Sequence, residues 1–244
     1  PCEGITTPGG FGGRVLPELA QAVLESCRDV FRAEIPHYFR HAITDARSVA
    51  PRVEYASGLE GPDPRCVVSI IGCTGDWFGG WDGLQPGSPD RFITADLRGG
   101  RLPEVLQKSE PAILVCHWAG IYCNGQETGF QIFQEVVRRL HAAYDHLIWM
   151  KLSEIARYWA AKELTRIDRD GNRLTLQAPF ACPRFTVRTS GQPSAAPSLR
   201  VEGQPRPLKE VKRPLDLQPG AWTRHPEGMI VCLDLPKGLS QLEW

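Results

Sequence analysis

The sequence predicts an α/β fold with a mainly parallel sheet over residues 1–162, followed by a small all-β, sandwich-like domain over residues 163–244. Two observations indicate the α/β part: apolar runs of strand length alternate with segments whose apolar residues recur at helical spacing. A third observation indicates the all-β part. Beyond Glu163, short alternating runs are separated by Gly and Pro turns, and no segment has a helical period. We find no pattern of catalytic residues in this second part.

The apolar pattern also places the individual elements of the first part. We expect helices where apolar residues repeat at i, i+3 and i+4, and buried strands where they run without interruption. Ser153 is expected to cap the last helix, and Arg138 and Arg139 are expected on the outer face of the helix before it. In chain order the expected helices are 16–31, 102–108, 130–143 and 153–162, and the expected strands are 66–72, 112–117 and 146–150.

Composition excludes several classes of partner. The chain has 244 residues, of which 42% are hydrophobic, so it can bury a core. Its 28 basic and 28 acidic residues cancel, and no run of Lys or Arg exceeds two, so neither nucleic acid nor an anionic membrane surface is an expected partner. No apolar stretch reaches the roughly 20 residues needed to span a bilayer. The eight cysteines form no Cys-x-x-Cys pair and are expected to be free thiols.

His117 is the first candidate for chemistry. It stands where the apolar run that begins at Ala112 stops, and in a parallel sheet functional groups collect where strands end. The alternative is a histidine that only caps the strand by bonding a neighbouring carbonyl group. Asp76 lies in the loop that follows the expected strand 66–72.

Four aromatic residues lie near these two candidates. Trp77 and Trp81 belong to a glycine-rich loop, and Trp118 and Tyr122 follow His117 directly. Large rings in such loops often form the walls of sugar-binding sites, but they can equally fold back onto the core. The exposure of the four rings separates these two interpretations.

Two further histidines, His37 and His41, are spaced four apart and could share a helix face as metal ligands. No third ligand is close to them in the sequence, and Pro36 stands beside them. The glycine-rich loop Gly4–Gly13 contains no phosphate-binding fingerprint, which argues against a nucleotide site.

Three short motifs resemble those of a known family. They are Thr7-Pro-Gly-Gly-Phe-Gly before the first helix, Gly75-Asp76-Trp77 after a strand, and Leu114-Val-Cys-His117 on a late strand. Their order and positions resemble the C-terminal part of a polysaccharide deacetylase catalytic domain, of the NodB-homology or carbohydrate esterase type. The resemblance covers roughly residues 1–162 and implies a partial, distorted (β/α) barrel.

The resemblance also implies roles for individual residues. His117 would be the general acid toward the leaving amine, and Asp76 would orient it and favour its protonated form. The two side chains are therefore expected within hydrogen-bonding reach, directly or through one water, at the C-terminal edge of the sheet. Trp77 would wall the acetyl or sugar site, and Val115 would line the acetyl pocket. The substrate would be an acetylated sugar, and the reaction would hydrolyse its C–N amide bond. The compartment is not indicated, although the resemblance is compatible with an extracytoplasmic protein.

The resemblance departs from the family pattern at the metal. A divalent, zinc-like ion is expected for the family, but its Asp-Asp and His-x3-His/Asp motifs are not found in this chain and would precede Pro1. The arginine of the first loop is also missing: Thr6 or Thr7 stands in its place, and Arg14 lies downstream. We therefore expect an incomplete hydrolase whose missing upstream segment, or a second copy of the chain, covers exposed surfaces.

Two other functions remain open. A glycosidase would use paired carboxylates, with Asp76, Asp82, Glu127 and Glu154 as candidates. A carbohydrate-binding protein without catalysis would instead stack sugar rings on the aromatic residues Trp77, Trp81, Trp118 and Tyr122.

Overall fold

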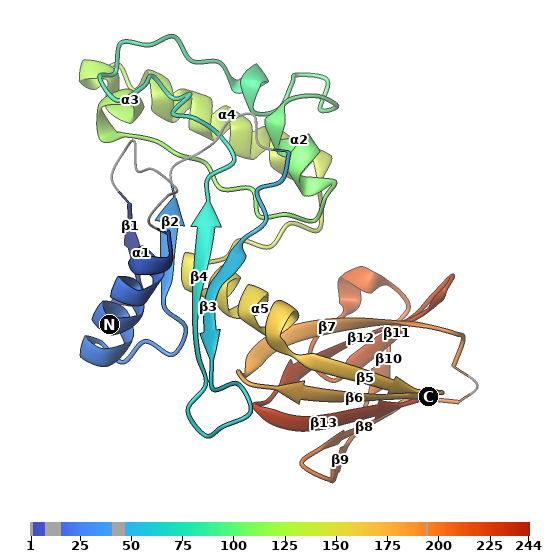
Figure 1. Cartoon of the computed structure of the whole chain (residues 1–244). Helices are drawn as coiled ribbons and strands as arrows, with labels where there is room; N and C mark the ends of the chain where they lie inside the picture. Colours follow the sequence, from blue (N-terminus) through green and yellow to red (C-terminus); the bar gives the residue numbers. More distant parts are fainter. Residues whose placement is uncertain (1, 8–15, 41–46, 194) are drawn as a thin grey trace. The chain divides into compact units, whose positions relative to one another are not determined.

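The computed structural model describes residues 2–7, 16–40, 47–193 and 195–244 (Figure 1). The expected motif at 7–12, apart from Thr7, lies outside the described residues, as do Arg14 and His41. The chain divides into two compact units. Unit 1 comprises Pro1–Glu54 and Val67–Ser153, and unit 2 comprises Tyr55–Cys66 and Glu154–Trp244. Unit 2 thus includes most of the helix that was expected to end the first part, which begins at residue 153, and also the separate segment Tyr55–Cys66.

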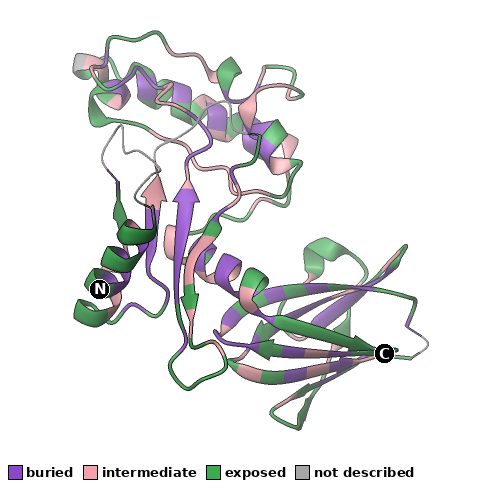
Figure 2. Cartoon of the chain, viewed as in Figure 1, coloured by how far each residue is buried: buried purple, intermediate pink, exposed green. Residues whose placement is uncertain are grey.

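The sheet of unit 1 has four strands in the order β1-β2-β4-β3. Their bounds are β1 (Gly4–Thr6), β2 (His37–Arg40), β3 (Arg52–Ser57) and β4 (Arg65–Ile71). β1 pairs with β2, and β2 with β4, in parallel. β4 is an interior strand, with β2 on one edge and β3 on the other. Its run Cys66-Val-Val-Ser-Ile70 is buried, as Figure 2 shows. The strand expected at 66–72 is confirmed.

Helices account for most of the remaining core of unit 1. α1 (Leu16–Val23) continues as the π-helix η2 (Leu24–Val30), which confirms a helix over 16–31. α4 (Thr128–Ala143) buries Ile132, Val136 and Leu140, which recur at i, i+4 and i+8 on one face. The other helical segments are η3 (Pro89–Arg91), α2 (Arg101–Leu106), α3 (Trp118–Tyr122) and η4 (Cys123–Gly125).

Arg139 does not lie on the outer face of α4, as the sequence pattern had suggested. It is 8% exposed, and its Nη1 donates to the Ile93 carbonyl at 2.7 Å and to Asp90 Oδ1 at 2.5 Å. Its Nε donates to Glu135 Oε1 at 2.7 Å. A buried guanidinium is tolerated when its donors are satisfied in this way, and here it ties α4 to the loop around η3. Arg138 is on the outside, as expected.

The expected partial (β/α) barrel with a mainly parallel sheet is wrong. The parallel pairing in unit 1 involves β1, β2 and β4, whereas the runs at 112–117 and 146–150 are extended segments outside the sheets. Residues 112–117 make one isolated bridge, between Val115 and Asp76. An apolar run becomes a buried strand only when neighbouring strands pair with it, and these two runs lack such partners among the residues that the structure describes.

Unit 2 packs two mostly antiparallel sheets around a common core. One sheet has the order β5-β6-β13-β8-β9 and the other β10-β11-β12-β7. The core contains side chains of both sheets, among them Trp222, Phe185 and Leu176. Ala161 of α5 (Leu152–Leu164) belongs to the same core. The strands are β5 (Arg166–Asp170), β6 (Arg173–Ala178), β7 (Cys182–Ser190), β8 (Ser198–Val201), β9 (Gln204–Arg206), β10 (Lys209–Glu210), β11 (Ala221–His225), β12 (Gly228–Leu235) and β13 (Gly238–Glu243), with the 3₁₀ turn η5 (Pro214–Asp216).

Two other expectations can be compared with the fold. All eight cysteines are free thiols, as expected. Ser153 lies inside α5, which begins at Leu152, so it is not the residue before the helix. Within the described ranges, we find no helix that is both long enough and apolar enough to cross a membrane.

Candidate functional site

Two extended segments bring the candidate residues of unit 1 together. Residues 72–77 leave the end of β4 and run parallel to residues 112–117. The Cys73 amide donates to the Ile113 carbonyl at 2.8 Å, and the Val115 amide lies 3.4 Å from Thr74 Oγ1. These bonds fix the register of the two segments, so that Asp76 and His117 lie at the same level.

Asp76 and His117 form a hydrogen-bonded pair, as expected from the roles that the resemblance implies. Asp76 Oδ2 lies 2.7 Å from His117 Nδ1 and accepts a second bond from the His117 backbone amide at 3.1 Å. Its Oδ1 lies 3.4 Å from the Phe78 amide. The carboxylate is therefore held by backbone amides and by the imidazole ring. The expected proximity of Asp76 and His117 is confirmed.

The geometry of the pair decides which ring nitrogen is free. A carboxylate only accepts, so Nδ1 carries the proton that points to Asp76, and Nε2 lies on the opposite edge of the ring. The Asp76 side chain is 12% exposed, whereas the His117 side chain is 51% exposed. An oriented imidazole with one nitrogen available to solvent can give or take a proton at Nε2.

Cys116, which precedes His117, is a poor candidate for a nucleophile. Desolvation of the sulfur, and secondly the charge of Asp76, raise the pKa of its thiol. Since the thiolate is the reactive form of cysteine, a raised pKa leaves little of it near neutral pH. The chemistry of the site therefore rests on the imidazole and the carboxylate.

The loop that follows Asp76 packs directly against α3, which follows His117. Gly120 and Gly129 allow this close approach: a Cβ at Gly129 would lie 2.2 Å from the Phe78 carbonyl oxygen, and one at Gly120 would lie 2.7 Å from the Gly80 carbonyl oxygen. The thiol of Cys123 adds a contact of 3.1 Å to the Gly83 carbonyl. Glycine is required at such positions because any side chain would collide with backbone.

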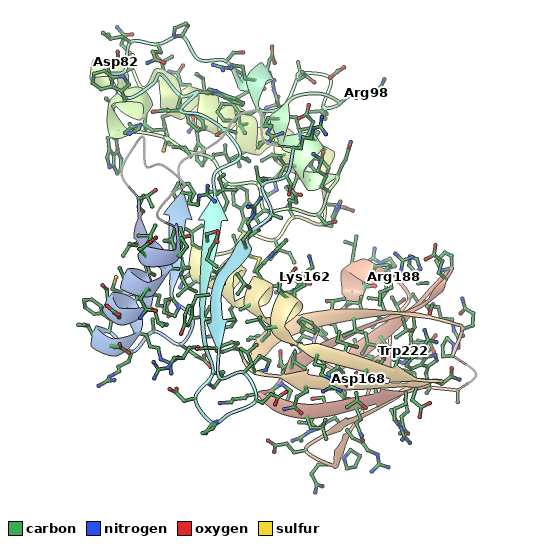
Figure 3. All side chains as sticks on the ribbon, in the orientation of Figure 1. Asp82, Arg98, Lys162, Asp168, Arg188 and Trp222 are labelled. Carbon is green, nitrogen blue, oxygen red and sulfur yellow. The ribbon has the colours of Figure 1, made fainter. Side chains whose placement is uncertain are left out.

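The four aromatic candidates divide into two groups. Trp118 and Tyr122, one turn apart on α3, stack at 5.5 Å between ring centroids with an interplanar angle of 11°, and they are 76% and 49% exposed. Trp81 is 69% exposed on the loop beside α3, near the labelled Asp82 in Figure 3. Trp77 instead packs on Phe92 and lies under the guanidinium of Arg91. Core packing thus explains Trp77, and only the other three rings are open to a ligand.

The paired-carboxylate alternative gains no support from this geometry. Asp76 pairs with an imidazole, and Asp82 accepts from the Leu84 amide at 3.0 Å within its own turn. Glu127 is exposed in a left-handed conformation before α4, and Glu154 belongs to unit 2. Val115, expected at an acetyl pocket, is half-buried beside Asp76 and serves as its bridge partner.

Sequence reasoning missed the residues that hold the two segments together. Thr74 is fully buried, and its hydroxyl faces the Val115 amide. Arg101, 11% exposed, donates from Nε to the Cys73 carbonyl at 3.0 Å and pairs with Glu104. A threonine directly after a buried strand and an arginine in the first turn of a helix are common features, so the sequence carries no distinct signal for these roles.

The resemblance implies a divalent metal whose ligands were not expected in this chain. Within the described parts of the chain, no group of three or more His, Cys, Asp or Glu side chains could hold an ion. His37 lies in strand β2 rather than on a helix. No match was found when the chain was compared with protein-family models, with curated proteins and with solved structures.

Proposed function

We propose that the Asp76–His117 pair is the acid–base dyad of a hydrolase that acts on acetylated sugars. The observation that carries the proposal is the 2.7 Å bond to Nδ1, which orients the ring and leaves Nε2 at a half-exposed surface. Next to it, the exposed Trp118–Tyr122 stack offers an apolar face of the kind on which sugar rings pack. A polar proton donor beside an aromatic surface suits a sugar substrate.

The proposed reaction is hydrolysis of the acetamide C–N bond. Water adds its oxygen to the acetyl carbon and its two protons pass to solvent, the C–N bond breaks, and acetate and a free amine result. The departing nitrogen takes one proton from His117 Nε2, and solvent returns a proton to His117. Asp76 keeps the ring in the required orientation throughout, through the bond to Nδ1. No described residue is assigned to the activation of water.

Acetate release from an N-acetylated chito-oligosaccharide tests the proposal, with Zn²⁺ added because the resemblance implies a divalent metal. His117→Gln is expected to lower kcat roughly 10²–10⁴-fold, since it removes the proton donor. His146→Gln is the matched control, because His146 also bonds a neighbouring aspartate, Asp145, at 3.1 Å, but its ring packs on Tyr144. Equal effects of both variants, or no acetate release by the parent chain, would contradict the enzymatic proposal.

A second candidate function, carbohydrate binding without catalysis, is favoured by one specific observation. Trp118 has 76% of its surface exposed although tryptophan is normally among the more buried residues. Under this alternative, Trp118→Ala weakens binding of the same oligosaccharide by roughly fivefold, about 1 kcal/mol, while His117→Gln leaves it unchanged. Isothermal titration calorimetry on both variants separates the two functions.

A further inference from the structure

The segment between α4 and α5 exposes a run of large apolar side chains. Residues 145–151 have the sequence Asp-His-Leu-Ile-Trp-Met-Lys. Within this run, Ile148 is 64% exposed, Trp149 60% and Met150 42%. Scattered exposed apolar residues are ordinary on a protein surface, but contiguous ones mark places where another molecule binds.

The backbone of the same segment is also open to a partner. Residues 146–150 are extended, and among the residues that the structure describes their backbone N–H and C=O groups bond to no other group of the chain. A row of unpaired backbone groups is a template on which a further strand can pair. Exposed edges are usually protected by an internal charge or a proline, and 147–150 contains neither.

The segment is held in its extended form by unit 1 itself. Leu147 packs on the core of this unit, and the ring of Trp149 lies 6.1 Å from that of His141 on α4. Side chains alternate along an extended chain, so Ile148 and Met150 belong to the opposite face. A segment that is already ordered loses less conformational entropy when a partner strand binds.

The sequence of the segment is complementary to itself. In an antiparallel pair with a twofold axis at Ile148, this residue faces its own copy, Leu147 faces Trp149, and Asp145 faces Lys151. Opposite-charge pairs and pairs of an aromatic with an aliphatic side chain stabilise neighbouring strands. The two ends therefore carry matched charges, and the centre carries matched apolar groups, as an interface between identical subunits requires.

The contacts that Asp145 makes within the chain do not prevent this pairing. Its carboxylate lies 3.1 Å from Nδ1 of His146, and the Asp145 side chain is 80% exposed. An exposed ion pair of this kind contributes about 0–1 kcal/mol, so exchanging it for Lys151 of a second copy costs little.

We propose that residues 145–151 pair antiparallel with the same residues of a second copy of this chain, with the twofold axis at Ile148. The charge pattern selects a second copy over an unrelated extended peptide, because only this register places Asp145 and Lys151 opposite each other at both ends. The paired segments are short, so the association is weak, and the chain is largely monomeric at low micromolar concentration.

Sedimentation equilibrium of the full chain tests the proposal, with a reducing agent present so that the exposed Cys116 does not cross-link the copies. The weight-average mass is expected to rise with concentration from 27.1 kDa toward twice this value. Ile148→Lys places two ammonium groups opposite each other and is expected to raise the dissociation constant at least roughly tenfold. Leu84→Lys is the matched control, because Leu84 is an apolar side chain 75% exposed on another surface segment, and it should leave the mass unchanged.

The register has a test of its own. Ile148→Asp alone should associate as poorly as Ile148→Lys, whereas an equimolar mixture of the two should associate again, because Lys then faces Asp. Likewise Asp145→Lys should weaken association, and the double exchange Asp145→Lys with Lys151→Asp should restore it. Circular dichroism checks that each variant is folded.

Three outcomes would overturn the proposal. A mass that stays at 27.1 kDa up to high micromolar concentration excludes the dimer. A loss of association in Leu84→Lys equal to that in Ile148→Lys shows that the segment 145–151 is not the interface. A mixture and a double exchange that both fail to restore association exclude the antiparallel register, even where the chain does form dimers.

Discussion

The two units differ in what their apolar segments find to pack against. In unit 2, nearly every apolar run is a strand with paired neighbours, and Trp222, Leu233 and Leu235 are 2% exposed or less. In unit 1, β4 is equally well buried, but the runs 112–117 and 146–150 lie outside the sheets. Ile148, Trp149 and Met150 consequently keep 42–64% of their surface exposed.

This difference has a functional counterpart. In unit 1 Asp76 and His117 lie in extended segments held by a few backbone bonds, and the stacked rings lie on the short helix α3 that follows. In unit 2 two sheets enclose a core, and a pocket of about 400 Å³ lies between β5 and β7. Extended segments and a short helix at the surface leave room for a large substrate, whereas a pocket of this volume suits a small molecule.

Replacing one tryptophan by alanine in each unit is expected to give the largest difference in the free energy of unfolding. Trp222→Ala, at a side chain 1% exposed and labelled in Figure 3, is expected to lower the free energy of unfolding by about 3–5 kcal/mol. Trp149→Ala, at a side chain 60% exposed, is expected to change it by no more than about 0.5 kcal/mol. Urea denaturation followed by circular dichroism measures both. A large loss in Trp149→Ala would show that the exposed segment is covered in solution.

A smaller effect is expected where the loop after Asp76 meets α3 and the start of α4. Gly129→Ala places a Cβ 2.2 Å from the Phe78 carbonyl oxygen and should cost about 1–3 kcal/mol by forcing the two backbones apart. Gly61→Ala is the control, because its nearest neighbour, the Gly58 carbonyl oxygen, would be 3.4 Å away. Thermal unfolding of the two variants compares them. Equal melting temperatures would show that this contact is looser than the structure indicates.

Much of the fold could be predicted from local pattern, and the errors have a common physical cause. The buried run 66–70 and the periodic helix at 128–143 were predictable, because each carries its own signal. β2 and β13 were not recognised: both are short and mixed in polarity, and they are stabilised by neighbours on both sides. Conversely, 112–117 and 146–150 resemble strands but pair with no strand of the sheets that the structure describes. Pairing is a long-range property that a local apolar pattern does not contain.

The candidate site shows the same limit. The proximity of Asp76 and His117 was expected from the family resemblance, and it holds although the barrel that the same resemblance implied is wrong. The pocket of unit 2 could not be predicted, since the residues that line it, such as Ile167, Thr189 and Trp244, lie far apart in the sequence. Sequence therefore indicates sites built near one motif better than sites built by sheet pairing.

The smallest expected effect concerns the pH dependence of unit 1 and depends on His37. This side chain is 6% exposed in β2, and its Nδ1 has no partner within the described segments. Burial lowers its pKa from the ordinary value of 6.5, outweighing the bond to Ile35 and the charge of Glu3, which act the other way. Below pH 6.5 the unfolded chain therefore binds a proton that the folded chain does not. Stability present above this pH is lost as the pH falls toward the lowered pKa, by about 1.4 kcal/mol per unit of depression.

His37→Phe removes this titration while keeping a ring in the core. The difference in unfolding free energy between pH 7.5 and 5.5 should shrink in this variant. In His146→Gln it should stay as in the parent chain, because His146 is 60% exposed. Denaturant unfolding at the two pH values measures the differences. If His37→Phe kept the full pH dependence, the loss would have to come from other groups, and the buried neutral histidine would not be what makes the sheet of unit 1 sensitive to acid.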